Sequence, residues 1–309
     1  MNHIVSSPAL HTPTRRTFLG AGCAVFVTAV SYAAKPFVRT QGINIRYAIP
    51  SYSFRKSFRW FKGKPQAPQG KPLDTFGFLD LCRSLGVGAE LTSYFFPPDA
   101  DKAFFRKVKR YAHVTGVPIV GTAIGNNFSL PAGDQLDAQV ADAIAWIDKA
   151  AILGAPHVRF FPGKQIDFSK GDGRVENAIK ALQTCADHAA KHGIFIGVEN
   201  HGQISPELLL RIIKGVESDW IGINLDTGNF VTETPYADLA TCVDYAVNVQ
   251  VKVMMKKADR SKYPADFGRI SNMLHDANYQ GAVVLEYEEE HPHEEIPKYL
   301  AKLKKAMAR

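Results

Sequence analysis

The amino-acid sequence predicts an α/β protein, a (β/α)8 TIM barrel in a single domain, and three observations carry this prediction. After residue 34, eight short runs of β-branched and apolar residues alternate with eight stretches of helical periodicity. The runs are apolar on both faces, as the strands of a buried parallel sheet are. No glycine-rich turn follows the first run, so a doubly wound open sheet is the weaker alternative.

The expected strands follow one another at a regular spacing. They cover residues 43–49, 87–92, 117–123, 157–161, 194–199, 221–226, 247–253 and 282–288. The expected helices lie between and after the strands. They cover residues 73–85, 99–115, 134–153, 174–192, 205–217, 235–245, 264–278 and 294–307. Ser205 and Pro206, at the start of one helix, are of the residue types preferred at an N-cap and a first turn.

Residues 1–33 are expected to be an export signal rather than part of the barrel. Thr14-Arg15-Arg16-Thr17-Phe18-Leu19-Gly20 is a twin-arginine signature, and an uncharged stretch runs to Ala34. Ser31-Tyr32-Ala33 offers a cleavage site with small residues. The mature barrel, residues 34–309, would be periplasmic or secreted, with no stable membrane association. The alternative is an uncleaved anchor, because the run is near the lower length limit for spanning a bilayer.

Charge and cysteine content exclude two other classes of protein. The formal net charge of +7 includes Arg15 and Arg16 of the signal, so the mature chain carries about +5, spread along its length. The densest basic cluster falls on the helix at 99–115 and is typical of a solvated helix face, so no nucleic-acid partner is expected. Three cysteines follow the signal without paired spacing, which indicates core residues rather than a disulfide framework. They are Cys82, Cys185 and Cys242.

One long connection stands out before the first helix. Residues 59–72 form a Pro/Gly-rich loop, and a loop of this length in a compact domain is usually a lid, a binding loop or plain surface.

Charged residues gather at the carboxyl ends of the expected strands, where the active site of such a barrel lies. Three of them are carboxylates, Glu199, Asp226 and Glu286, on the fifth, sixth and eighth strands. Closure of the barrel brings these ends around one pocket, where three acids would repel one another unless a cation lay among them. A metal site is therefore favoured over a solvated acidic rim.

The nature of the donors predicts the metal. Glu199, Asp226 and Glu286 with the amide oxygen of Gln250 form an all-oxygen set, which favours Mn²⁺ or Mg²⁺ over Zn²⁺. Zn²⁺ would become the better candidate if a histidine such as His201 joined the set.

Four motifs at these strand ends resemble the xylose isomerase-like TIM barrel superfamily, of the sugar phosphate isomerase/epimerase type. They are Gly197-Val-Glu-Asn-His201, Leu225-Asp-Thr-Gly-Asn229, Val249-Gln-Val-Lys252 and Gly281-Ala-Val-Val-Leu-Glu286, and the resemblance covers nearly the whole mature chain. It implies that Glu199, Asp226, Gln250 and Glu286 bind one divalent metal ion. It also implies that Glu199 and Glu286 act as acid and base on opposite faces of a ketose or aldose.

Two positions depart from the family pattern. Gln250 stands where the family usually has a histidine ligand, which affects the identity and affinity of the metal. Asn229 stands where ketose epimerases often have a substrate-binding histidine, which affects the choice of substrate.

The residue types suit proton abstraction next to a carbonyl. The enediolate that forms is stabilised by a divalent ion on its oxygens, and a carboxylate within about 3 Å of the carbon-bound proton acts as base. Lys252 either neutralises the developing oxyanion or is an interior lysine paired with Glu199 or Asp226. His201 is expected to line the pocket, and Asn127 to contact sugar by its position after the third strand. Glu90 and Arg159 either pair with each other or touch substrate hydroxyls.

The sequence thus predicts an exported, metal-dependent carbohydrate isomerase or epimerase that acts on a small-molecule substrate, and a homo-oligomer is possible. Export favours a free sugar or a 3-keto-glycoside over a sugar phosphate. On a 3-keto-glycoside the same base and metal would drive β-elimination, so a lyase is the alternative. An abasic-site endonuclease would need three zinc ions and more histidines. A non-catalytic sugar-binding barrel would tolerate loss of a ligand carboxylate, and all three are present.

Overall fold

A computed structural model describes residues 33–308 of the chain. The predicted export signal lies outside the described residues except for Ala33. None of the described helices is long and apolar enough to cross a membrane.

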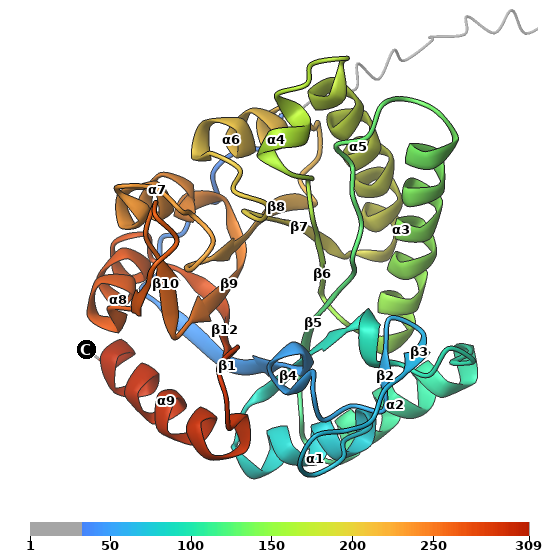
Figure 1. Cartoon of the computed structure of the whole chain (residues 1–309), viewed down its shortest axis with the longest axis vertical. Helices are drawn as coiled ribbons and strands as arrows, with labels where there is room; N and C mark the ends of the chain where they lie inside the picture. The colour runs from blue at the N-terminus through green and yellow to red at the C-terminus, as the bar shows by residue number, and fades with distance from the viewer. Residues whose placement is uncertain (1–32, 309) are drawn as a thin grey trace, which may run out of the picture. The chain divides into compact units, whose positions relative to one another are not determined.

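Eight parallel strands close into a barrel, in the order β1-β12-β9-β8-β7-β6-β5-β4 (Figure 1). This confirms the predicted fold. The strands are β1 (Asn44–Pro50), β4 (Gly88–Thr92), β5 (Ile119–Ala123), β6 (His157–Phe160), β7 (Phe195–Glu199), β8 (Ile221–Asp226), β9 (Ala246–Lys252) and β12 (Gln280–Glu286). Each expected strand is present, with ends that differ by at most two residues.

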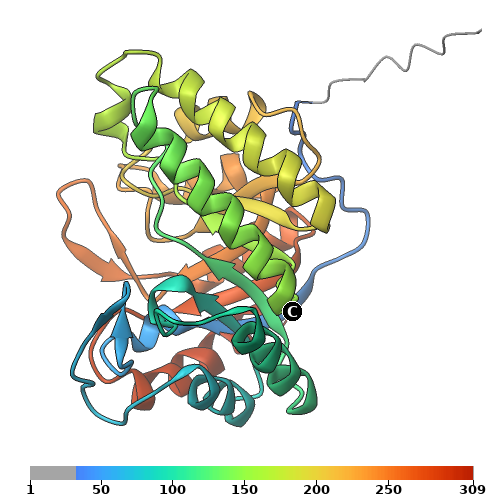
Figure 2. The same ribbon diagram turned by 90° about the vertical axis from the view of Figure 1, so that its right-hand side faces the viewer.

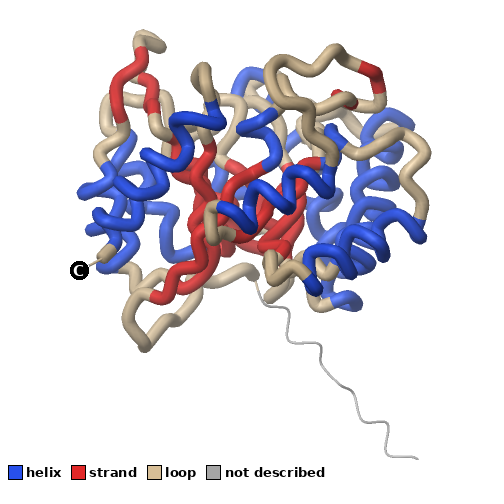
Figure 3. The backbone as a smooth tube through the Cα atoms, turned by 90° about the horizontal axis from the view of Figure 1, so that it is seen from below, coloured by secondary structure: helices blue, strands red, loops and turns tan. Residues whose placement is uncertain are grey.

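Helices enclose the barrel on its outside (Figures 1 and 3). They are α1 (Thr75–Ser84), α2 (Lys102–Val114), α3 (Asp134–Leu153), α5 (Arg174–His192), α6 (Pro206–Lys214), α7 (Pro235–Cys242), α8 (Phe267–Asp276) and α9 (Pro292–Met307). The hydroxyl of Ser205 caps α6 by accepting a hydrogen bond from the backbone of Leu208 at 3.2 Å. Cys82, Cys185 and Cys242 are free and buried in the core, as predicted.

Several short elements were not predicted. The loop at 59–72 contains a hairpin of β2 (Trp60–Phe61) and β3 (Lys64–Pro65), and a second hairpin, β10 (Met254–Lys256) and β11 (Lys262–Pro264), follows β9. The remaining short elements are α4 (Gln165–Phe168), η1 (Ser51–Phe54), η2 (Ser93–Phe95) and η3 (Val243–Tyr245). Elements of two to four residues are too short to show a hydrophobic period.

The β10–β11 hairpin projects beyond the strand ends, in orange at the left of Figure 2. Lys262 on the hairpin forms an ion pair of 2.6 Å with Glu289, which follows β12. Arg260 at its tip lies 3.4 Å from the side-chain oxygen of Gln203, in the β7–α6 connection. The hairpin therefore contacts two connections at the carboxyl ends of the strands.

The alternation along each strand explains why both faces are buried. Ile223 and Leu225 of β8 pack into the core, while the alternate residues Asn224 and Asp226 belong to a separate buried polar set. The same alternation in β9 separates apolar from polar residues. A small apolar cluster, which includes Ala48 of β1, forms from strand residues apart from the main core. Polar residues thus occupy buried strand positions that a packed core would normally fill with apolar ones.

Candidate active site at the carboxyl ends of the strands

The three predicted carboxylates are the last residues of their strands, Glu199 of β7, Asp226 of β8 and Glu286 of β12. All three are buried, with 5%, 0% and 7% of their surface exposed. Gln250 lies opposite Asp226 in the sheet register, and Lys252 lies opposite Glu286. The carboxylates repel one another electrostatically, since Glu199 helps to raise the pKa of both Asp226 and Glu286, and Glu286 helps to raise that of Asp226.

Glu199 is held by three side chains. Arg159 of β6 places its Nε 3.0 Å from Oε2, while Asn229 donates from Nδ2 to Oε1 at 2.8 Å and His201 Nδ1 lies 3.2 Å from the same oxygen. Burial opposes ionisation of Glu199, but Arg159 and His201 outweigh it and lower its pKa to about 2. Glu199 is therefore ionised at neutral pH. Of the two carboxylates, Arg159 forms its ion pair with Glu199 and not with Glu90.

Lys252 is the cation shared by the other carboxylates. Its Nζ lies 3.5 Å from Asp226 Oδ2, 3.5 Å from Glu286 Oε2 and 3.2 Å from an oxygen of Glu288. Burial lowers the pKa of the lysine, but these three acids outweigh it and raise its pKa well above the usual value. Lys252 thus has the predicted pairing with Asp226 and, in addition, pairs with Glu286 and Glu288.

The surroundings of Asp226 and Glu286 shift their pKa values in the opposite direction from that of Glu199. Burial raises the pKa of Asp226 well above its ordinary value, and Glu286 and Glu199 add to this effect. Burial, with Glu288 and Glu199, also raises the pKa of Glu286. The site therefore contains one strongly acidic carboxyl group and two that retain protons more readily, although all three are the last residues of barrel strands.

Glu90 and Gln250 belong to a buried network of side chains. Gln250 donates from its amide to Glu90 at 3.0 Å and accepts from Asn224 at 2.6 Å, while Asn248 donates to Glu90 at 3.2 Å and to Asn224 at 2.7 Å. Burial raises the pKa of Glu90 to about 8. The role of Gln250 as a metal ligand and the role of Glu90 toward substrate remain predictions.

The donor set fits a divalent ion in charge and in chemistry. Four buried or half-buried carboxylates, those of Glu199, Asp226, Glu286 and Glu288, face the two cations Arg159 and Lys252, which leaves an excess of two negative charges when all are ionised. Asp226 Oδ2 is buried without a hydrogen-bond partner. The carboxylate oxygens of Glu199, Asp226 and Glu286 are too far apart for one oxygen of each to lie within 4.8 Å of the other two. These side chains must therefore move closer together to bind an ion.

Two further predicted residues have defined positions. His201, whose Nδ1 lies 3.2 Å from Glu199, also packs its ring on Phe161, with ring centroids 4.2 Å apart. Its role in lining the substrate pocket remains a prediction. The side-chain oxygen of Asn127 accepts hydrogen bonds from the backbone and hydroxyl of Ser129, at 3.0 and 2.7 Å, in the loop after β5. Its contact with sugar remains a prediction.

Several residues of the site were missed from the sequence. Asn224 and Asn248 precede Asp226 and Gln250 by two positions, and the period of a strand puts such residues on the same face, so this signal was present. Asn200 bonds both backbone groups of Asp226, at 2.8 and 2.7 Å. Tyr94, next to Arg159, had no signal because it follows β4 within a short 3-10 helix.

His157 is the first residue of β6, two positions before Arg159, and should make the stability of the protein sensitive to pH. A Cβ at Gly121 would lie 2.2 Å from its ring and one at Gly197 would lie 2.9 Å from it, so these two glycines leave room for the ring. Burial, with Arg159, lowers its pKa from 6.5 to about 4. The unfolded chain binds this proton first as the pH falls, so we expect the histidine's contribution, on the order of 3 kcal/mol, to be lost between pH 6.5 and 4.

Urea unfolding at pH 7.5 and 4.5 measures this contribution. His157→Gln should lose less stability between the two pH values than the wild type, whereas His113→Gln, at an exposed position of α2, should behave as the wild type does. Equal pH dependence in all three proteins would show that His157 is not the titrating group.

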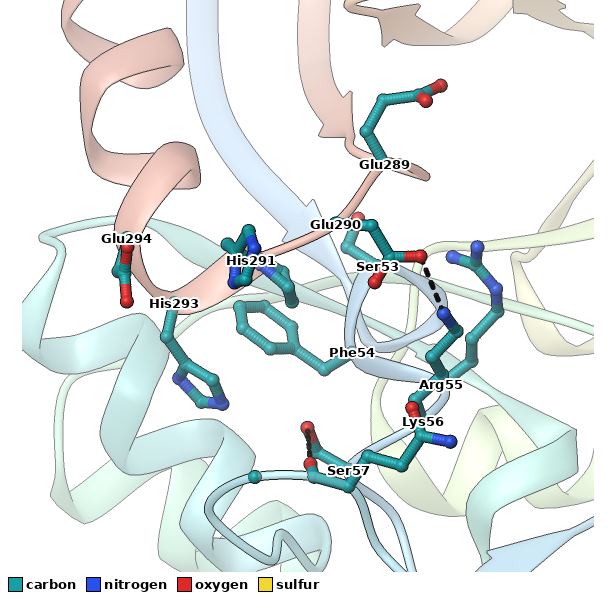
Figure 4. Close-up of a pocket in the computed structure, with 13 residues that line it drawn as sticks. Ser53, Phe54, Arg55, Lys56, Ser57, Glu289, Glu290, His291, His293 and Glu294 are labelled. Carbon is teal, nitrogen blue, oxygen red and sulfur yellow. Dashed lines mark hydrogen bonds and ion pairs between the residues drawn. The ribbon is translucent and has the colours of Figure 1, made fainter.

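A separate hollow lies beside the strand ends, between η1 and the start of α9 (Figure 4). It has a volume of about 250 Å³, and Phe54 and His293 line it with ring centroids 4.9 Å apart. Lys56 and Glu290 form an ion pair of 2.8 Å at its edge. None of the predicted site residues lines this hollow.

Comparison with known proteins agrees with the resemblance read from the motifs. The model of a protein family described as "Xylose isomerase-like TIM barrel" matches residues 79–306. No curated protein sequence matches the chain.

Solved structures with the same fold have low sequence identity to this chain. D-psicose 3-epimerase from Clostridium cellulolyticum H10, solved with D-tagatose, is 15% identical over 85% of this chain and 99% of its own, with a TM-score of 0.68. The 3-keto-D-glucoside 4-epimerase from E. coli is 17% identical over 85% and 99%, with a TM-score of 0.61. A xylose isomerase-like TIM barrel protein from Mycobacterium smegmatis, in complex with magnesium, is 18% identical over 87% and 98%, with a TM-score of 0.61.

Proposed function

The chain belongs to the xylose isomerase-like TIM barrel family, and from this premise we propose that it is an enzyme that isomerises or epimerises a carbohydrate. The single observation that supports the proposal best is the pair of glutamates at the ends of β7 and β12. The pKa of Glu199 is lowered to about 2 while that of Glu286 is raised. Carboxyl groups whose environments push their pKa values apart are suited to act as base and acid.

In the proposed reaction, Glu199 removes the proton from the carbon next to a substrate carbonyl. The electron pair of the broken C–H bond forms an enediolate, and Glu286 returns a proton to carbon, on the opposite face for an epimerisation. Arg159, which pairs with Glu199, and Lys252, which pairs with Glu286, would stabilise the negative charge on the substrate oxygens. His201 and Asn229 keep Glu199 oriented and are proposed to contact substrate.

A divalent metal ion is part of the proposal. Glu199, Asp226 and Glu286 would hold it, with Gln250 as the fourth ligand, and the oxygen donors favour Mn²⁺, with Mg²⁺ or Zn²⁺ as alternatives. When bound, the ion would polarise the substrate carbonyl and stabilise charge on its oxygens. The M. smegmatis protein of the same fold contains magnesium, which supports an oxygen-liganded ion here.

The alternative reaction is β-elimination on a 3-keto-glycoside, which uses the same base to remove a proton next to the keto group. The E. coli protein of the same fold is named for a 3-keto-D-glucoside, which supports this class of substrate. Elimination releases the aglycone, whereas epimerisation retains it, so the products distinguish the two reactions. We also propose twin-arginine export, removal of the signal and a periplasmic or secreted location.

The first test is metal content with substrate turnover. We expect mass spectrometry of purified mature protein supplied with Mn²⁺ to find about one divalent ion in the barrel, and Glu199→Gln/Asp226→Asn to lose it, because each substitution removes a ligand charge. NMR in D2O with keto-sugars and 3-keto-glycosides should then show exchange of the proton next to the carbonyl. A wild type that binds no ion and exchanges no proton would contradict the proposal.

A further inference from the structure

A second group of metal-binding side chains lies on the helices outside the barrel. His188 and His192 of α5 place their Nε2 atoms 2.8 and 3.3 Å from Oδ1 of Asp148 on α3. One donor atom from each residue lies within 4.8 Å of the other two. Among residues 33–308, this is the one group of three or more histidine, cysteine, aspartate or glutamate side chains with that spacing.

The helices explain why the three donors converge. Residues four apart lie on the same face of a helix, so both imidazoles of α5 point in one direction. Helix α3 lies beside α5 (Figures 1 and 2) and supplies the carboxylate. The group is near the last turns of both helices, which end at Leu153 and His192. These helix ends lead into β6 and β7, so the group lies at the amino end of the strands, away from Glu199.

The distances are close to those of a bound metal ion. Zn²⁺ binds nitrogen and oxygen at about 2.0–2.1 Å in a tetrahedron, which separates neighbouring donors by roughly 3.3 Å. The pair Asp148–His192 already has a separation of 3.3 Å, and Asp148–His188, at 2.8 Å, would open by about 0.5 Å. The three side chains are 51%, 25% and 35% exposed, for Asp148, His188 and His192, so they are accessible to an ion and free to adjust.

We propose that Asp148, His188 and His192 bind a Zn²⁺ ion, with water as the remaining ligand. Two imidazoles select zinc, nickel or copper over magnesium and manganese, which prefer oxygen donors. The site is therefore distinct in chemistry as well as in place from the oxygen-rich site in the barrel. Because one ligand comes from α3 and two from α5, the ion would link the two helices and stabilise the folded protein.

Calorimetric titration of zinc chloride into mature protein stripped of metal tests the proposal. We expect one zinc ion per chain at this site, with at least tenfold weaker binding in His188→Ala/His192→Ala and unchanged binding in His113→Ala, which removes an exposed histidine of α2. Zinc should also raise the Tm of the wild type and of the His113 variant, but not that of the double variant.

The variant Glu199→Gln/Asp226→Asn separates this site from the barrel site. It should keep the zinc affinity that depends on His188 and His192, whatever the outcome of the manganese experiment. The proposal is overturned if the wild type binds no zinc in the calorimetric titration. It is also overturned if zinc binding is lost in the variant of the barrel carboxylates and kept in the variant without the two histidines. A wild-type Tm that does not change with zinc would overturn it as well, because the two histidines would then only hydrogen-bond to Asp148.

Discussion

Replacing Glu286 by glutamine is expected to reduce epimer formation by about 10²–10⁴-fold, the usual effect of losing a general acid or base. The amide keeps the size of the side chain but has no acidic proton to return to the carbon. Glu286 is buried and 3.5 Å from Lys252, which retains Asp226 and Glu288 as partners in the variant. The fold should therefore persist, and the loss should appear in kcat.

The separate roles of the two glutamates lead to a second expected result for the same variant. Glu199 is still ionised in the Glu286→Gln variant, so NMR in D2O should show exchange of the proton on its face of the substrate, while the epimer no longer accumulates. Glu207→Gln, on the exposed first turn of α6, is the matched control and should react as the wild type does. Equal loss of exchange and epimerisation in Glu286→Gln would contradict separate roles for the two carboxylates.

Replacing Arg159 by methionine is expected to lower the free energy of unfolding by about 3–5 kcal/mol, because it leaves the buried charge of Glu199 without its partner. The guanidinium also donates to the carbonyl of Ile124 at 2.9 Å and lies 4.0 Å from the ring centroid of Phe161. Urea unfolding at pH 7 measures the loss. Below about pH 4.5 the difference should shrink toward pH 2, since Arg159 stabilises only the ionised form of Glu199.

An exposed ion pair provides the control for this experiment. Arg211 and Glu176 are 2.7 Å apart, with side chains 62% and 55% exposed, so Arg211→Met should cost less than about 1 kcal/mol. The double variant Arg159→Met/Glu199→Gln should regain part of the lost stability, because the unpaired charge is removed. Similar losses for the Arg159 and Arg211 variants would show that burial of the first pair has no energetic consequence.

The order of strands and helices could be predicted because it follows from the local periodicity of apolar residues. The β8 strand was recognised from the apolar run before Asp226, and Ser205 and Pro206 marked the start of α6. The same local logic located Glu199, Asp226 and Glu286 at strand ends. The hairpins at 60–65 and 254–264 were not predicted, because their strands are only two or three residues long.

The contacts of the charged residues were not determined by the sequence. Glu90 and Arg159 had both been assigned to strand ends, yet one bonds to Gln250 and the other pairs with Glu199. The histidines at 188 and 192 show helical spacing in the sequence, but nothing there indicates Asp148, which comes from another helix 40 residues earlier.

By itself, then, the sequence determined the barrel, the strand that ends in each candidate carboxylate and the family. Only the tertiary structure decided which cation neutralises which carboxylate, and therefore that the pKa of Glu199 is lowered while that of Glu286 is raised. The physical reason is the separation along the chain over which each effect acts. Hydrophobic periodicity acts between neighbours along the chain, whereas a pKa depends on burial and on charges a few ångströms away, which closure of the barrel brings from distant segments.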